Sequence, residues 1–259
     1  MEFLSVVPFS IMTGFVAVFG LLVGSFSNVC IYRMPKRESV VFPASHCTAC
    51  NSPVRAYDNI PVISYLLLGG KCRSCGVKIS PMYPAIELII GLLITLAFLR
   101  SGLSVEFAVT ATVSAVLVII TVIDFQHRII PDRITLPGII FGFAAGFYLE
   151  GWRDSLIGFF LGGGLFYLIA VLSRGGMGGG DIKFIAAAGA LVGWQKVLLI
   201  IFIGALAGSV VGIALMVLKG GTRKSMIPFG PFLALGTLAV LYYGDDLVRY
   251  YLSAMQQPF

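Results

Sequence analysis

The run Val116-Leu-Val-Ile-Ile-Thr-Val-Ile-Asp124 places a carboxylate directly after an apolar stretch. A second carboxylate ends the glycine-rich stretch Gly175-Gly-Met-Gly-Gly-Gly-Asp181 and opens another apolar run. Burying a carboxylate in a membrane-spanning helix costs about 2.5–3.5 kcal/mol on insertion scales, so intramembrane acids are functional candidates. Two carboxylates at the same membrane face could share a proton and activate a water molecule, as in peptide-bond hydrolysis.

Composition places these runs in a polytopic membrane protein. Of the 259 residues, 58% are hydrophobic and only 12% are charged, whereas a soluble domain carries about 25% charged residues. We attribute the net charge of +6 to cytoplasmic loops, where positive residues accumulate, and not to a nucleic-acid partner. Glycines recur every four residues, which is typical of helices that pack closely in lipid. They are Gly138, Gly142 and Gly146; Gly158 and Gly162; and Gly204, Gly208 and Gly212.

We expect an all-α fold of about eight membrane-spanning helices, taking about 20 residues for each span. The first run lacks the charged start and the cleavage site of a secretory signal, so it should be retained as a span. The chain then divides into a first helix (1–32), a cytoplasmic segment (33–82) and a multi-helix membrane domain (83–259). The expected spans are approximately 9–31, 83–100, 104–124, 136–150, 155–172, 182–195, 197–218 and 229–244.

The lysines and arginines predict the orientation of these spans. If the N-terminus lies outside, all but four of them fall in inner loops, including Lys219, Arg223 and Lys224. Positive residues favour the cytoplasmic side, so this asymmetry supports that orientation. The same orientation puts Asp124 and Asp181 at the cytoplasmic face, although the aspartates were not used to choose the orientation. The four outer residues are Arg100, Arg153, Lys196 and Arg249.

The cytoplasmic segment contains two C-x2-C pairs, Cys47-Thr-Ala-Cys50 and Cys72-Arg-Ser-Cys75. Each pair can present two thiolates to a tetrahedral metal, and a segment of about 50 residues needs such a staple. We favour structural zinc on Cys47, Cys50, Cys72 and Cys75. Disulfides are disfavoured by the reducing cytosol, and a redox or iron site by the absence of a thioredoxin-like pattern. His46 could replace one ligand, although four cysteines already complete the shell.

The two aspartates occupy different local positions. Asp124 ends a span, where the helix dipole disfavours a negative charge, whereas Asp181 begins a helix, where the dipole and free amides favour one. Asp181 can therefore be interpreted as a plain helix cap. The neighbouring glycines favour a chemical role instead, because they let the backbone approach a ligand or flex. These glycines are Gly178, Gly179 and Gly180.

Two other charged residues near the aspartates have ordinary interpretations. Asp132 follows Pro131 and is expected to cap the helix that begins before Leu136. Lys183 lies close to Asp181 in sequence. We expect it to anchor the helix at the membrane interface and not to adjust the charge of that aspartate.

In these residues and several further motifs the chain resembles the prepilin peptidases, or type IV leader peptidases. The resemblance covers nearly the whole chain. The G-x-G-D motif is shared with presenilin-like intramembrane aspartyl proteases, which lack the cysteine segment. The motifs are Gly24-Ser-Phe-Ser-Asn28-Val-Cys-Ile-Tyr-Arg33-Met-Pro35, the two cysteine pairs, Ile79-Ser-Pro-Met-Tyr-Pro84-Ala-Ile-Glu87, Asp124 through Asp132, Gly178-Gly-Gly-Asp181-Ile-Lys183 and Ile227-Pro-Phe-Gly-Pro231.

The resemblance implies a membrane aspartic endopeptidase of the bacterial inner membrane. Such an enzyme removes the basic leader of type IV prepilins or type II secretion pseudopilins at the cytoplasmic face, cutting after a glycine. The catalytic pair would be Asp124 and Asp181, with Gly178, Gly179 and Gly180 as the active-site loop. Neither carboxylate would act as a covalent nucleophile.

The resemblance also implies a second activity, because members with the cysteine segment often N-methylate the new N-terminus with S-adenosylmethionine. The chain has no glycine-rich nucleotide loop after a strand, so the methyl-donor site would be unconventional. Asn28, Arg33 and Glu87 are weak candidates for it. Their ordinary interpretations are snorkelling for Arg33 and helix-end hydrogen bonding for the other two.

Two functions of other classes stay open as alternatives. Intramembrane acids and glycine-interrupted helices also occur in proton-coupled transporters, but here both acids lie at one face and the two halves do not match. A zinc-containing membrane scaffold without chemistry would tolerate the loss of both aspartates. The expected partners are pilin-type substrates and membrane lipids. The sequence specifies neither the individual substrate nor the oligomeric state.

Overall fold

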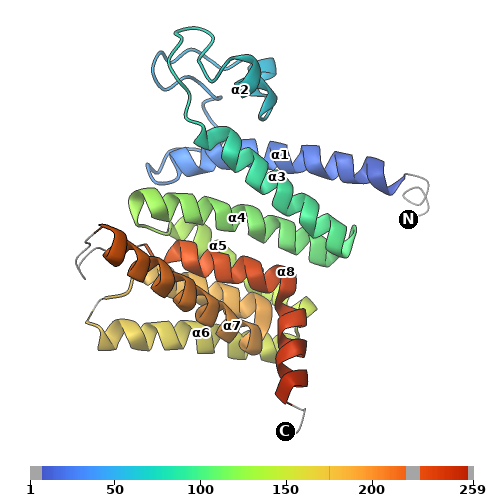
Figure 1. Ribbon diagram of the computed structural model, residues 1–259, viewed down its shortest axis with the longest axis vertical. Helices are drawn as coiled ribbons and strands as arrows, with labels where there is room; N and C mark the ends of the chain where they lie inside the picture. Colours follow the sequence, from blue (N-terminus) through green and yellow to red (C-terminus); the bar gives the residue numbers. More distant parts are fainter. Residues whose placement is uncertain (1–7, 175, 220–227, 256–259) are drawn as a thin grey trace. The chain divides into compact units, whose positions relative to one another are not determined.

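The computed structural model describes residues 8–174, 176–219 and 228–255, and those residues form helices and loops without a strand (Figure 1). The chain divides into two compact units, Met1–Ile119 and Ile120–Phe259. Helix α4 (Val105–His127) contributes residues to both units. Arg223, Lys224 and Ile227, which the sequence analysis used, lie outside the described residues.

The first unit is built on two long apolar helices, α1 (Phe9–Arg33) and α3 (Met82–Ser101), which pack against each other. Small residues permit this approach, since a Cβ added at Gly24 would lie 2.6 Å from Cα of Glu87. The residues between them, 34–81, form a small lobe that we call the cysteine lobe. It contains η2 (Ala56–Asn59) and α2 (Ile63–Leu67).

The second unit is organised around α7 (Gly179–Lys219), which contacts each of the other complete helices of this unit (Figure 1). The predicted role of the glycine repeats in helix packing is confirmed in α5 and α6. A Cβ at Gly142 would lie 2.6 Å from the carbonyl oxygen of Ala187, and one at Gly162 would lie 2.9 Å from that of Ile185. These other helices are α5 (Asp132–Leu149), α6 (Trp152–Leu172) and α8 (Gly230–Met255).

The structure confirms a multi-pass helical protein but not eight separate spans. Among the described residues, five helices are long and apolar enough to cross a membrane, namely α1, α3, α4, α6 and α7. The expected spans 182–195 and 197–218 correspond to the two parts of α7, which are separated at Gly193, where the backbone is not helical (φ 77°, ψ 175°). Helix α5 contains Pro137 and starts with charged residues, so it falls outside this set.

Candidate active site and metal centre

Asp124 lies one turn before the end of α4 and is only 5% exposed. Its Oδ2 accepts a hydrogen bond of 3.0 Å from the backbone N–H of Gly230, the first residue of α8. A helix N-terminus favours a nearby negative charge, so α8 offsets the unfavourable dipole of α4. From the sequence, only the unfavourable dipole of α4 could be inferred. The Pro-Phe-Gly-Pro motif that ends at Pro231 was the signal for this contact.

Asp181 is the third residue of α7 and is partly buried. Its carboxylate has a hydrogen bond with the backbone of Gly178, the residue that precedes the helix. A carboxylate at this position that reaches back to the helix start forms half of a capping box. Asp181 therefore caps α7, which agrees with its interpretation as a helix cap. Capping does not conflict with a chemical role, since the cap fixes where the carboxylate lies.

The second unit brings the two aspartates near each other from different helices. The charge of Asp124 acts on Asp181, and the buried side chain of Ile130 lies against the segments that hold them. A Cβ at Gly180 would lie 2.9 Å from Cβ of Ile130, and one at Gly230 would lie 3.2 Å from its Cδ1. Two neighbouring carboxylates resist ionising together, so such a pair readily holds one proton between its members.

The expected cap at Asp132 is not formed. Pro131 occupies the position before α5 and makes no side-chain cap hydrogen bond, while Asp132 already lies within the first turn. The Asp132 carboxylate instead accepts a bond of 2.6 Å from Nζ of Lys183, which joins the starts of α5 and α7. Both side chains are exposed, so this ion pair contributes little to stability. Lys183 thus has a partner other than Asp181.

The cysteine lobe contains two knuckles of the same geometry. The Cys47 N–H bonds to the Ser52 carbonyl at 2.9 Å, and the Cys72 N–H bonds to the Val77 carbonyl at 2.9 Å. In each knuckle the residue after the second cysteine has a left-handed backbone, with φ of 55° at Asn51 and 69° at Gly76. Asparagine and glycine are the residues that adopt this conformation most easily. This repeated feature, an asparagine or glycine directly after each C-x2-C pair, was not predicted from the sequence.

The four predicted cysteines form one cluster that could hold a metal ion. Their sulfur atoms all lie within 4.8 Å of one another, and Sγ of Cys47 lies 3.9 Å from Sγ of Cys75. Zinc bonded to sulfur at about 2.3 Å in a tetrahedron places the sulfurs roughly 3.8 Å apart. All five cysteines are free thiols in the structure, so no pair is joined as a disulfide there. His46 lies outside the cluster and contacts the Ala44 carbonyl.

Electrostatics in the lobe favour thiolate at one position and oppose it at another. The Ser52 hydroxyl, 3.3 Å from Sγ of Cys50, lowers the pKa of that thiol to about 6. The pKa of Cys75 is raised to about 11, because loss of solvent and the other thiols outweigh a backbone hydrogen bond at Val77. A metal ion binds the thiolate form of cysteine, so it would hold all four sulfurs ionised.

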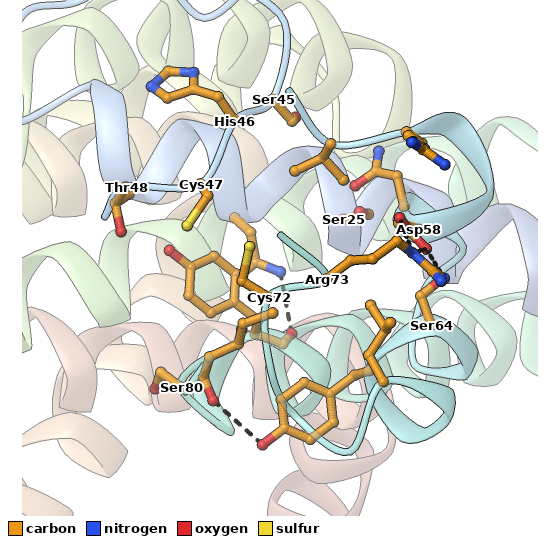
Figure 2. A pocket seen from close by; sticks show the side chains of 18 of the residues that line it. Ser25, Ser45, His46, Cys47, Thr48, Asp58, Ser64, Cys72, Arg73 and Ser80 are labelled. Carbon is orange, nitrogen blue, oxygen red and sulfur yellow. Dashed lines mark hydrogen bonds and ion pairs between the residues drawn. The ribbon is translucent and has the colours of Figure 1, made fainter. Parts of the chain in front are cut away.

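Asn28, Arg33 and Glu87 all line one cavity of about 640 Å³ between α1, the start of α3 and the cysteine lobe. Arg33 does not snorkel, because it is 6% exposed and donates to the Ser39 carbonyl at 3.0 Å. Glu87 accepts a bond of 2.7 Å from the Val62 N–H. Figure 2 shows Cys47 and Cys72 pointing toward each other in the wall of this cavity, with Arg73 paired to Asp58.

One unit holds two nearby carboxylates at the ends of apolar helices and the other holds a four-cysteine lobe, a combination that a polytopic membrane protein of the aspartyl-peptidase type would have. Residues 18–101 match the bacterial peptidase A24 N-terminal domain, and residues 111–213 match the type IV leader peptidase family. The first match covers most of α1, the cysteine lobe and α3, and the second begins in α4.

Curated relatives extend these matches along the chain. The prepilin leader peptidase/N-methyltransferase of Aeromonas salmonicida is 34% identical, with 93% of this chain and 94% of the relative covered. The proteins of the same name from Bacillus subtilis and Pseudomonas aeruginosa are each 33% identical, covering 93% and 90% of this chain and 98% and 91% of their own length. No solved structure matches the chain.

The chain belongs to the prepilin leader peptidase/N-methyltransferase family, and the predicted resemblance and enzyme class are confirmed at that level. The alternative of a proton-coupled transporter receives no support from this family membership. The alternative of a zinc-containing scaffold without chemistry likewise receives no support, since the curated relatives are named as enzymes.

Proposed function

We propose that this chain is a membrane aspartic endopeptidase that removes the leader from type IV prepilins or type II secretion pseudopilins. We further propose that it N-methylates the new N-terminal residue with S-adenosylmethionine. The observation that carries the peptidase proposal is the proximity of Asp124 and Asp181, which come from the end of one helix and the start of another in a chain of this family.

In the proposed reaction the aspartate pair acts as acid and base. One carboxylate takes a proton from a water molecule, whose oxygen attacks the carbonyl carbon of the scissile peptide. The protonated partner gives its proton to the carbonyl oxygen, which produces a neutral tetrahedral intermediate. Collapse of this intermediate breaks the C–N bond, returns a proton to the nitrogen, and leaves a carboxyl group and an amine. No covalent enzyme intermediate forms, and the pair titrates as a unit.

The glycine loop gives the substrate room to approach this pair. Among the described residues, no atom lies within 4 Å of a Cβ added at Gly179, whereas a Cβ at Gly180 would lie 2.9 Å from Cβ of Ile130. Gly180 is therefore required by packing against the protein itself. Gly179 leaves open space beside Asp181, and we propose that the extended scissile peptide enters there. We propose that the reaction takes place at the cytoplasmic face of the inner membrane, because the scissile peptide would follow a basic leader and positive residues are in excess in the expected inner loops.

Zinc is the metal that we propose for Cys47, Cys50, Cys72 and Cys75. Four sulfur ligands at tetrahedral spacing complete the coordination of the ion, so it would stabilise the lobe and not activate water. Its contribution is to tie the two knuckles together in a segment too small to fold on a hydrophobic core alone. Membrane lipids are the other expected partners, because the apolar faces of the long helices are exposed.

Mass spectrometry of a co-expressed prepilin tests both activities together. The expected product has lost its leader and gained the mass of one methyl group. Trimmed but unmethylated pilin would retain the peptidase and reject the transferase. An untrimmed prepilin in the presence of correctly inserted protein would reject the proposed peptidase.

A further inference from the structure

We propose that the cavity between α1, the start of α3 and the cysteine lobe is the binding site for the methyl donor S-adenosylmethionine. This inference rests on the proposed methyltransferase function and names its site. The cavity volume of about 640 Å³ lies within the range of about 300–1,000 Å³ that is typical of small-molecule sites. A nucleoside-sized ligand fits such a space, whereas the transmembrane helix of a pilin would not.

The floor of the cavity is polar although membrane helices build it. Ser25, Asn28 and Tyr32 follow one another at intervals of three and four residues, so they share one face of α1 and line the cavity. Glu87 joins them from α3. Asn28 and Glu87 are only 7% and 8% exposed. Polar side chains buried on apolar membrane helices are costly, which makes these residues candidates for a functional site.

Hydrogen bonds hold this polar floor in a fixed shape. Asn28 donates to the Tyr83 carbonyl at 3.1 Å, and Glu87 accepts from the Val62 N–H at 2.7 Å. Val62 has a φ of 62°, which is unfavourable for a β-branched side chain. Such backbone strain concentrates at ligand sites, where the surrounding structure enforces it. Here the Glu87 carboxylate fixes the strained residue at the cavity wall.

The chemistry of the lining matches each part of the donor. Its sulfonium is a cation, which a carboxylate such as Glu87 and the faces of tyrosine rings attract. Its adenine ring stacks on aromatic side chains, and Tyr32, Tyr65 and Tyr83 all line the cavity. Its amino-acid end carries a carboxylate, for which Lys78 in the lining supplies a partner of opposite charge. When bound, the donor supplies a methyl group to the free amine and leaves as a neutral thioether, while the amine loses a proton to water.

Equilibrium binding of radiolabelled S-adenosylmethionine to the purified full-length protein tests this site. Val29 lines the cavity, and Val29→Trp fills the space without removing a polar contact. Glu87→Gln keeps the shape and removes the charge. Val18, on the same helix, is 57% exposed and lies outside the cavity, so Val18→Trp is the matched control. Metal content and the gel-filtration profile report whether each variant keeps its fold.

We expect wild type and Val18→Trp to bind alike, and Val29→Trp and Glu87→Gln each to bind at least about tenfold more weakly, the equivalent of about 1.4 kcal/mol. Wild-type affinity in both cavity variants would overturn the site and leave the methyltransferase function standing. A wild-type protein that neither binds the donor nor methylates a co-expressed prepilin would overturn that function as well.

Discussion

The Asp124 carboxylate at the end of α4 is held by the backbone N–H of Gly230 at the start of α8, at 3.0 Å. These residues are 106 positions apart in the chain, so the contact fixes the position of one member of the aspartate pair through a distant helix. The amide is part of the backbone and cannot be removed by replacing a side chain. Crowding at Gly230 is the way to disturb it.

Replacing Gly230 with alanine should impair cleavage without unfolding the protein. The new Cβ would lie 2.6 Å from Oδ2 of Asp124 and would displace the carboxylate. A misplacement of about 1 Å at a reacting group can cost about 10²-fold in rate, and we expect a loss of about 10- to 100-fold in kcat/KM. Gly164→Ala is the control, since no atom in the described part of the chain lies within 4 Å of its added Cβ. Equal activity of the two variants would contradict the importance of this contact.

Two neighbouring glycines of the active-site loop should respond differently to alanine. Gly180→Ala introduces a Cβ 2.9 Å from Ile130 and should lower both stability and activity. The added Cβ of Gly179→Ala meets no atom of the described residues within 4 Å, so the melting temperature of this variant should stay near that of wild type while kcat/KM falls. Thermal unfolding and cleavage of a prepilin peptide, measured on the same preparations, separate the two effects.

The partial rescue of Gly180→Ala by a smaller neighbour provides a further check on this packing. Ile130→Gly removes the Cβ that the new Cβ of Gly180→Ala would approach to 2.9 Å. The loss of stability in the double variant should therefore be smaller than the sum of the two single losses. A simple sum of two destabilising effects would show that Ile130 is not the obstacle.

The cysteine cluster should bind one zinc ion in a pH-dependent way. The pKa of Cys50 is about 6, so its thiolate dominates above that pH, and protons compete with the metal increasingly as the pH falls through it. Metal analysis after dialysis at a series of pH values should show retention near pH 7 and release in acid. Cys72→Ser should lower retention at every pH, while Cys30→Ser, at the buried free thiol outside the cluster, should not.

Loss of zinc should also weaken methyl-donor binding. Cys47 and Cys72 belong both to the metal cluster and to the wall of the cavity beside α1. Chelation should therefore reduce the binding of radiolabelled S-adenosylmethionine. Cleavage should be affected less, because the aspartate pair lies in the other unit. Donor binding that is unaffected after complete metal removal would contradict the coupling.

The candidate aspartates and the four cysteines could be named from the sequence because each carries a local signal. Carboxylates at the ends of apolar runs are costly enough to be conspicuous, and two C-x2-C pairs determine their own ligand geometry. Asn28, Arg33 and Glu87 were only weak candidates, since nothing local in the sequence shows that separate segments meet in one cavity. The structure supplies that proximity.

The error at Asp132 came from competition between local rules. Asp132 has the chemistry of a helix cap, but Pro131 takes that position and the carboxylate pairs with Lys183 instead. The boundary between the spans 182–195 and 197–218 was predicted close to its place, since the non-helical residue Gly193 separates the two parts of α7. A glycine between two apolar runs is a local signal for such a break.

The most direct test of the account is single-turnover cleavage of a prepilin by purified Asp124→Asn and Asp181→Asn. Asp132→Asn serves as the control, because it removes a nearby exposed carboxylate outside the pair. General acid–base catalysis contributes about 10²- to 10⁴-fold in rate, so each of the two variants should lose activity by roughly 10³-fold or more while the control cleaves normally. Near-normal cleavage by either Asp124→Asn or Asp181→Asn would contradict the aspartate pair as the catalytic centre.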